Sequence, residues 1–162
     1  MASSVPVLIL ASVLALMMLA AAVSDLRTRT IANGLNAAIA LLAIPYWFAS
    51  GLAPWPDMAV QVGLAALVFA AFVGLFMVGG MGGGDVKMIG ALALWVPPSL
   101  LLPMLTVMAI GGGLLSGAML IDKIARKRAQ PPEVPYGVAI AAAGLWVLHQ
   151  QYLNLFTFNA VT

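Results

Sequence analysis

Residues 5–23 read VPVLILASVLALMMLAAAV, a run of nineteen residues without a charged side chain. About 20 such residues cross the hydrocarbon core of a bilayer as one α-helix. The first basic residues of the chain, Arg27 and Arg29, follow this run. A secretory signal peptide carries its basic residues before the apolar run instead. We therefore interpret residues 5–23 as a retained first membrane span whose N-terminus lies outside.

The composition of the whole chain agrees with this interpretation. Of its 162 residues, 64% are hydrophobic and 7% are charged, whereas about 25% of the residues of a soluble domain are charged. The ten-residue alternating pattern of a membrane barrel is absent, so we expect the spanning elements to be helices. The predicted fold is an all-α, polytopic membrane bundle that forms one domain over residues 1–162.

The residue types that are missing exclude several kinds of site. The chain has no cysteine, which rules out disulfides, thiolate zinc sites and cysteine nucleophiles. His149 is the sole histidine, so a site with several histidine ligands is ruled out as well. The net charge of +2 is small and forms no basic patch of the kind that binds nucleic acid. We expect a lipid-embedded protein without a metal or cofactor and without a nucleic-acid partner.

Hydropathy predicts about six spans. The prolines at 97, 98 and 103 interrupt the fourth and fifth spans, and a turn at Pro97–Pro98 would leave the fourth short or broken. Trp47, Trp55 and Trp95 are expected near the outer interface, where tryptophan is enriched. The predicted spans are about 5–23, 34–50, 58–78, 86–102, 104–121 and 136–153.

The positions of the basic residues predict the orientation of these spans. All seven Lys and Arg residues fall in the loops 24–33, 79–87 and 122–135. The loops on the other side contain none, and cytoplasmic loops are the ones that carry an excess of Lys and Arg. Both termini are therefore expected outside and the three basic loops in the cytoplasm.

This orientation places Asp25, at the end of the first span, and Asp85, at the start of the fourth, at the same membrane depth. Two carboxyl groups that meet cannot both ionise easily, so one is expected to stay ionised while the other keeps its proton. Such a pair can activate water and polarise a peptide carbonyl, which would hydrolyse a peptide bond. We assign Asp57 to a turn and Asp122 to local pairing with its basic neighbours.

The stretch GGMGGGDVKM, residues 79–88, leads directly into Asp85. Gly82, Gly83 and Gly84 have no Cβ, so the backbone of a substrate could lie beside the carboxyl group. The competing interpretation is a flexible turn or close helix packing by small residues. Lys87 either reaches the lipid headgroups or stabilises the ionised form of the aspartate pair.

Two other classes of protein stay open at this point. A small proton-coupled transporter would also use intramembrane carboxylates, but nearer the middle of the bilayer. A non-catalytic subunit of a secretion machine would leave the matched depth of the two aspartates without an explanation.

Three segments resemble a known family. Gly82, Gly84 and Asp85 form the G-x-G-D signature of membrane aspartic peptidases. SDLRTRTIAN at 24–33 resembles the segment that closes the first span in prepilin peptidases, and VPYGVAIA at 134–141 resembles the segment that opens their last span. The chain is similar to the short prepilin peptidases of tight-adherence (Flp-type) pilus systems, over nearly its whole length.

The resemblance implies that Asp25 and Asp85 are the catalytic pair and that no cofactor takes part. The implied substrate is a prepilin or pseudopilin, cut after a small residue at the cytoplasmic face of the bacterial inner membrane. Ala32 stands where the family usually has Pro, which is a departure in the loop after the first span. The larger family members carry a cysteine-containing cytoplasmic insert and N-methylate the cut pilin. This chain lacks the insert, so we expect cleavage without methylation.

Overall fold

The computed structural model describes residues 4–126 and 134–159, with side chains up to residue 151. Within these residues all regular structure is helical, which confirms the predicted all-α fold. The elements are α1 (Ser4–Thr28), α2 (Asn33–Ala49), the short η1 (Pro54–Met58), α3 (Ala59–Met77), α4 (Gly83–Ala93), α5 (Pro98–Ala125) and α6 (Tyr136–Asn159).

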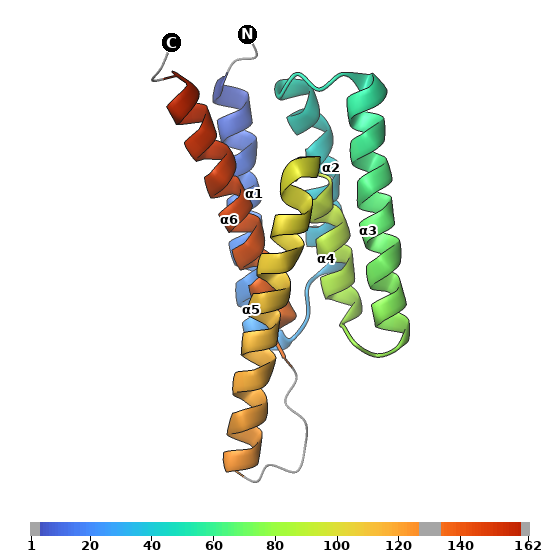
Figure 1. The fold of residues 1–162 in the computed structure, drawn as a ribbon, viewed down its shortest axis with the longest axis vertical. Coiled ribbons are helices and arrows are strands. Elements are labelled where there is room, and N and C mark those ends of the chain that lie inside the picture. The colour runs from blue at the N-terminus through green and yellow to red at the C-terminus, as the bar shows by residue number, and fades with distance from the viewer. Residues whose placement is uncertain (1–3, 127–133, 160–162) are drawn as a thin grey trace.

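The helices run up and down through one bundle (Figure 1). The short helix α4 packs against α2, α3 and α6, while α6 also packs against α1 and α5. Helix α4 thus lies among three other helices, and eight of its eleven residues are buried. A carboxyl group on α4 is therefore enclosed by the rest of the chain.

Three helical stretches of the described chain are long and apolar enough to cross a membrane: Val5–Thr28, Pro54–Met77 and Pro98–Ala125. Large apolar side chains such as Leu16, Leu67 and Leu114 point outward from them. In water such exposure would be unfavourable, whereas lipid solvates it. The protein is a helical membrane bundle.

The predicted fourth and fifth spans have the wrong boundaries. Helix α4 ends at Ala93, and its eleven residues rise only about 16 Å, about half of a bilayer core. Helix α5 begins at Pro98 and continues through Pro103. The predicted turn at Pro97–Pro98 is correct, because Pro98 is the first residue of α5 and needs no backbone donor there.

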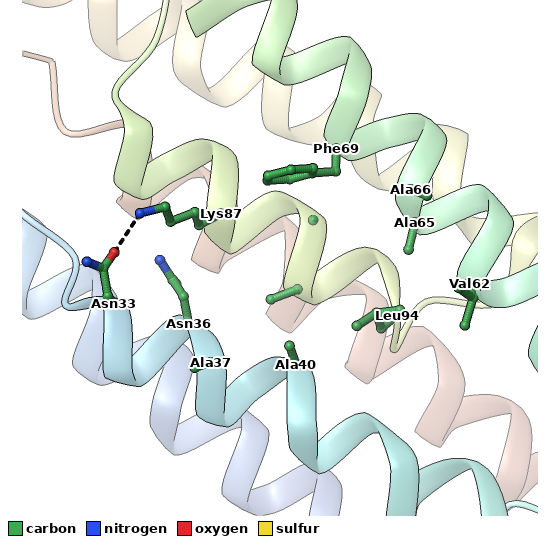
Figure 2. A pocket seen from close by; sticks show the side chains of 12 residues that line it. Asn33, Asn36, Ala37, Ala40, Val62, Ala65, Ala66, Phe69, Lys87 and Leu94 are labelled. Atoms are coloured by element: carbon green, nitrogen blue, oxygen red, sulfur yellow. Dashed lines mark hydrogen bonds between the residues drawn. The ribbon is translucent and has the colours of Figure 1, made fainter.

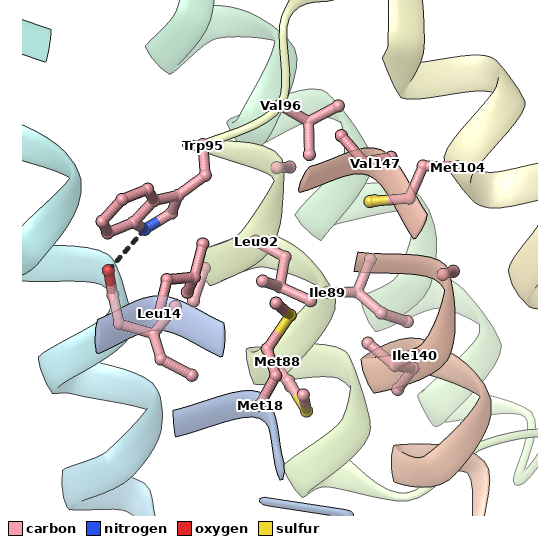
Figure 3. Packing of buried hydrophobic residues seen from close by; sticks show 14 of the residues in the cluster. Leu14, Met18, Met88, Ile89, Leu92, Trp95, Val96, Met104, Ile140 and Val147 are labelled. Carbon is pink, nitrogen blue, oxygen red and sulfur yellow. Dashed lines mark hydrogen bonds between the residues drawn. The ribbon is translucent and has the colours of Figure 1, made fainter. Parts of the chain in front are cut away.

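Trp47 and Trp95, which we predicted near the outer interface, do not lie on the outer surface of the bundle. Both are buried, at 7% and 3% exposure, because the connection between α4 and α5 lies inside the bundle. The indole N–H of Trp95 donates to the carbonyl of Ile39 at 2.8 Å, and its ring packs at the edge of the apolar core (Figure 3). Trp55, by contrast, is 80% exposed.

The described basic residues gather at one end of the molecule, which we call the basic end. It holds the α1–α2 and α3–α4 connections and the C-terminal end of α5 (Figure 1), with Arg27, Arg29, Lys87, Lys123 and Arg126. The predicted basic residues Lys127 and Arg128 lie outside the described residues. Helix α1 begins, and α6 ends, at the opposite end of the bundle.

Candidate active site

Asp25 lies in the last turn of α1, and hydrogen bonds after it fold the chain back. The Ser24 hydroxyl donates to the carbonyl of Thr30 at 2.8 Å, and the Thr28 hydroxyl donates to the carbonyl of Ser24 at 2.9 Å. Arg29 then ends the helix in the left-handed conformation, with φ of 55°. This turn keeps Asp25 at 5% exposure inside the bundle although it stands near the end of its helix.

The first turn of α6 supplies the partner of Asp25. The backbone N–H of Gly137 donates to Oδ2 of Asp25 at 2.8 Å, across 112 residues of sequence. A methyl group added at Gly137 would lie 2.8 Å from the same oxygen, so the contact depends on glycine. A backbone donor at a helix N-terminus favours a negatively charged acceptor. This contact therefore stabilises Asp25 as a carboxylate.

Helix α5 shapes the position of this donor through Tyr136. A methyl group at Gly112 would lie 2.7 Å from Cε1 of Tyr136, so the tyrosine ring occupies the space that a side chain at 112 would need. The Ser116 hydroxyl lies 3.1 Å from the Tyr136 hydroxyl. Helix α5 is continuous through the glycines at 111–113, and Gly112 leaves space for the ring of Tyr136, the residue that precedes Gly137.

Asp85 lies in the first turn of α4 at 9% exposure. Gly82 precedes the helix in an extended conformation, and a methyl group there would lie 2.9 Å from Oδ2 of Asp85. The side-chain amide of Asn36 on α2 donates to the carbonyl of Gly84 at 3.1 Å. The helix start and the amide of α2 together hold the segment that carries Asp85.

The two carboxyl groups are neighbours in the same buried region. Ile31, from the α1–α2 connection, lies close to both sites: an added methyl group at Gly84, next to Asp85, would lie 3.4 Å from Ile31, and one at Gly137, whose N–H binds Asp25, would lie 2.9 Å from it. Burial, and then the negative charge of Asp25, raise the pKa of Asp85 from 3.8 to about 6, against a smaller effect of the Gly82 backbone. Among the hydrogen bonds of the described residues, none joins the two carboxyl groups directly.

The glycines before Asp85 differ in what they touch. Gly82 faces the Asp85 carboxyl group and Gly84 faces Ile31, whereas a methyl group at Gly83 would lie 3.3 Å from the ring of Phe76. Gly82 and Gly84 thus pack against Asp85 and Ile31. Gly83 faces α3.

Lys87 lies on α4 but is directed toward α2. Its ammonium group donates to Oδ1 of Asn33 at 2.8 Å (Figure 2). Both residues border a groove of about 550 Å³ between α2, α3 and α4, whose remaining lining is mostly alanine and glycine with Asn36 and Phe69. In this structure the hydrogen-bond partner of Lys87 is therefore Asn33.

The remaining predicted residues are accounted for locally. Oδ2 of Asp57 accepts the backbone N–H of Ala53 at 3.1 Å, as expected for a turn residue. Asp122 pairs with Arg126 at 2.6 Å, as predicted. Ala32 has φ of −61°, close to the value that proline imposes, so the backbone at this position has the conformation that the family proline would require.

The model of the type IV leader peptidase family matches residues 12–117. The chain belongs to the type IV leader peptidase family. The match covers both Asp25 and Asp85 and ends before α6. No curated protein and no solved structure is significantly similar to the chain. Membership in the family makes the protein a leader peptidase in the general sense, and its helices place it in a membrane.

Sequence reasoning missed two residues that this leader peptidase brings to the site. The segment VPYGVAIA was noticed for its family resemblance, but Gly137 received no role because its partner lies 112 residues away. Asn36 also went unnoticed, since an asparagine within an apolar helix carries no signal of which carbonyl it meets. A buried polar residue in a predicted span is the one hint that the sequence offers.

Proposed function

We propose that the protein is a membrane aspartic endopeptidase that removes the leader of Flp-type prepilins at the cytoplasmic face of the bacterial inner membrane. The observation that supports this most strongly is that two buried carboxyl groups, Asp25 from α1 and Asp85 from α4, lie near enough at the basic end for the charge of Asp25 to raise the pKa of Asp85. They are set near the ends of their helices, which fits a loop-accessible peptide better than a proton path through mid-membrane.

The different surroundings of the two carboxyl groups suggest their roles. Asp25 accepts the Gly137 N–H, which favours the ionised form, so Asp25 is assigned as the base that takes a proton from water. Asp85, with its pKa raised to about 6, is assigned as the acid that donates to the scissile carbonyl. The hydroxide adds to the carbonyl carbon, and Asp25 then returns its proton to the leaving amine as the C–N bond breaks. Asp85 regains its proton when the carbonyl re-forms.

Gly82, Gly83, Gly84 and Lys87 are proposed as the substrate-facing loop. Gly82 and Gly84 have no Cβ, so the loop backbone lies directly against Asp85 and Ile31, and an extended substrate backbone is proposed to pair with this loop. Lys87 would meet a polar group of the substrate only after leaving Asn33. The chain contains no cysteine, so the cysteine-containing insert of larger relatives is missing, and cleavage without N-methylation is proposed.

The test is leader removal from a co-expressed Flp-type prepilin, followed by the shift in gel mobility. Asp25→Asn and Asp85→Asn should each abolish cleavage at equal membrane levels of the protein. Asp57→Asn is the matched control, since the same change lies in the exposed turn beside Ala53 and should leave cleavage intact. Continued cleavage by either of the first two variants would show that the pair is not the catalytic unit.

A further inference from the structure

The end of α4 that lies farthest from Asp85 poses a problem of backbone hydrogen bonding. Helix α4 ends at Ala93, and the connection to α5 lies inside the bundle, well short of the ends of α2 and α3 that η1 joins (Figure 1). The last carbonyls of a helix have no intrahelical donor. Pro97 and Pro98, which follow after three more residues, supply no N–H groups. Each carbonyl here needs a donor from elsewhere, because lipid provides none.

Two side chains from neighbouring helices supply these donors. The amide Nε2 of Gln61, on α3, donates to the carbonyls of Ala93 at 2.7 Å and Val96 at 2.6 Å. The indole N–H of Trp47, on α2, donates to the carbonyl of Leu94 at 2.8 Å.

The local backbone satisfies further carbonyls of the same turn. The N–H groups of Leu94 and Trp95 donate to the carbonyls of Ala91 and Leu92, at 3.3 and 2.9 Å. Among the carbonyls that follow, Gln61 and Trp47 reach those of Ala93, Leu94 and Val96. Gln61 is itself 4% exposed and makes both of its bonds to this one connection, so its amide is committed to the end of α4.

We propose that Gln61 is a positioning residue for Asp85, which rests on the proposed function of the aspartate pair. Apolar side chains allow a helix to slide against its neighbours, whereas two directional hydrogen bonds at its end fix its depth in the bundle. Asp85 stands eight residues before Ala93, about 12 Å along a stiff helix, so a shift at one end is transmitted to the other. At the other end of α4 the Asn36 amide donates to the Gly84 carbonyl, so hydrogen bonds from neighbouring helices hold the helix at both ends, and Gln61 supplies two of them.

The first test compares Gln61→Leu with wild-type enzyme, using a purified Flp-type prepilin as the substrate in proteoliposomes. Leucine keeps much of the volume and removes both donors. We expect kcat to fall at least about tenfold with KM unchanged within about twofold, because a misplaced catalytic group slows chemistry without removing substrate contacts. Gln151→Leu is the matched control. The Gln151 side chain accepts a hydrogen bond from the Tyr46 hydroxyl at 3.3 Å, and this hydrogen bond does not involve α4.

A second measurement reports the position of α4 without requiring activity. The natural chain has no cysteine, so a single Lys87→Cys change introduces one thiol on an exposed position of α4. Its alkylation rate by a membrane-impermeant maleimide should change at least about threefold when Gln61→Leu is added, and should stay the same with Gln151→Leu. Trp47→Phe removes one donor and keeps a ring, so it should change the alkylation rate in the same direction as Gln61→Leu but by a smaller factor. It replaces Gln61→Leu as the test variant if Gln61→Leu fails to fold.

These measurements separate two kinds of failure. If the wild-type protein cuts no prepilin while the alkylation rates shift as expected, the proposed function is wrong, but the proposal that Gln61 fixes the position of α4 is supported. If Gln61→Leu keeps wild-type kcat, or loses activity only in proportion to folded protein with the alkylation rate unchanged, the positioning role is wrong.

Discussion

Replacement of Gly137 by alanine sets two physical effects against each other. Gly137 is the second residue of α6, and alanine is favoured over glycine inside a helix by about 1 kcal/mol. The added methyl group, however, would lie 2.8 Å from Oδ2 of Asp25, 2.9 Å from Cδ1 of Ile31 and 3.0 Å from Cβ of Asp25. Helix propensity therefore predicts a neutral or more stable protein, while the contacts predict a displaced carboxylate.

The size of the effect follows from the distances. An ordinary contact of this kind begins near 3.4 Å, so Asp25 must withdraw by about 0.6 Å. The bond from the Gly137 N–H would lengthen from 2.8 Å to about 3.4 Å, beyond the usual range of such bonds. A hydrogen bond to a charged group contributes about 1.5–3 kcal/mol, which corresponds to a factor of about 10 to 150 in rate. We expect Gly137→Ala to lower kcat/KM for prepilin cleavage by about ten- to a hundredfold.

The assay is quantitative cleavage in proteoliposomes together with thermal unfolding in detergent. Gly34→Ala is the matched control, because Gly34 is likewise the second residue of its helix, α2, and a methyl group there meets nothing within 4 Å. It should cut at the wild-type rate. Wild-type activity in Gly137→Ala would refute the assigned role of the Gly137 N–H, as would an equal loss of activity in both variants.

Three further predictions follow from the same contacts. Gly112→Ala places a methyl group 2.7 Å from the Tyr136 ring and should slow cleavage several-fold, whereas Gly113→Ala, with nothing within 4 Å, should not. Because the folded-state pKa of Asp85 is raised to about 6, its ionisation lowers the stability of the protein as the pH rises from about 4 through 6. The melting temperature of Asp85→Asn should therefore exceed that of the wild type at pH 7.5 and converge with it at pH 4. A difference that stays constant with pH would contradict this. Trp95→Phe removes the donor to the Ile39 carbonyl at 2.8 Å and should lower the free energy of unfolding by about 1–3 kcal/mol in detergent, while a change at exposed Trp55 to Phe should not.

The sequence by itself determined the membrane class and the number of helices, and it singled out Asp25 and Asp85 as the proposed pair. These properties are encoded locally, because the length of an apolar run decides whether a helix can span and each Lys or Arg marks its own loop. Asp25 and Asp85 stood out for the same reason, since a carboxylate next to an apolar run is costly wherever the chain goes afterwards.

Only the tertiary structure decided where α4 stops and what holds its ends. The hydropathy of residues 86–102 is continuous, so the end at Ala93 could not be read from it. Gln61 and Trp47, from two other helices, satisfy carbonyls at that end. The Gly137 N–H likewise reaches Asp25 from 112 residues away. Such contacts depend on the distance between atoms of different helices, a quantity that local composition and spacing do not contain.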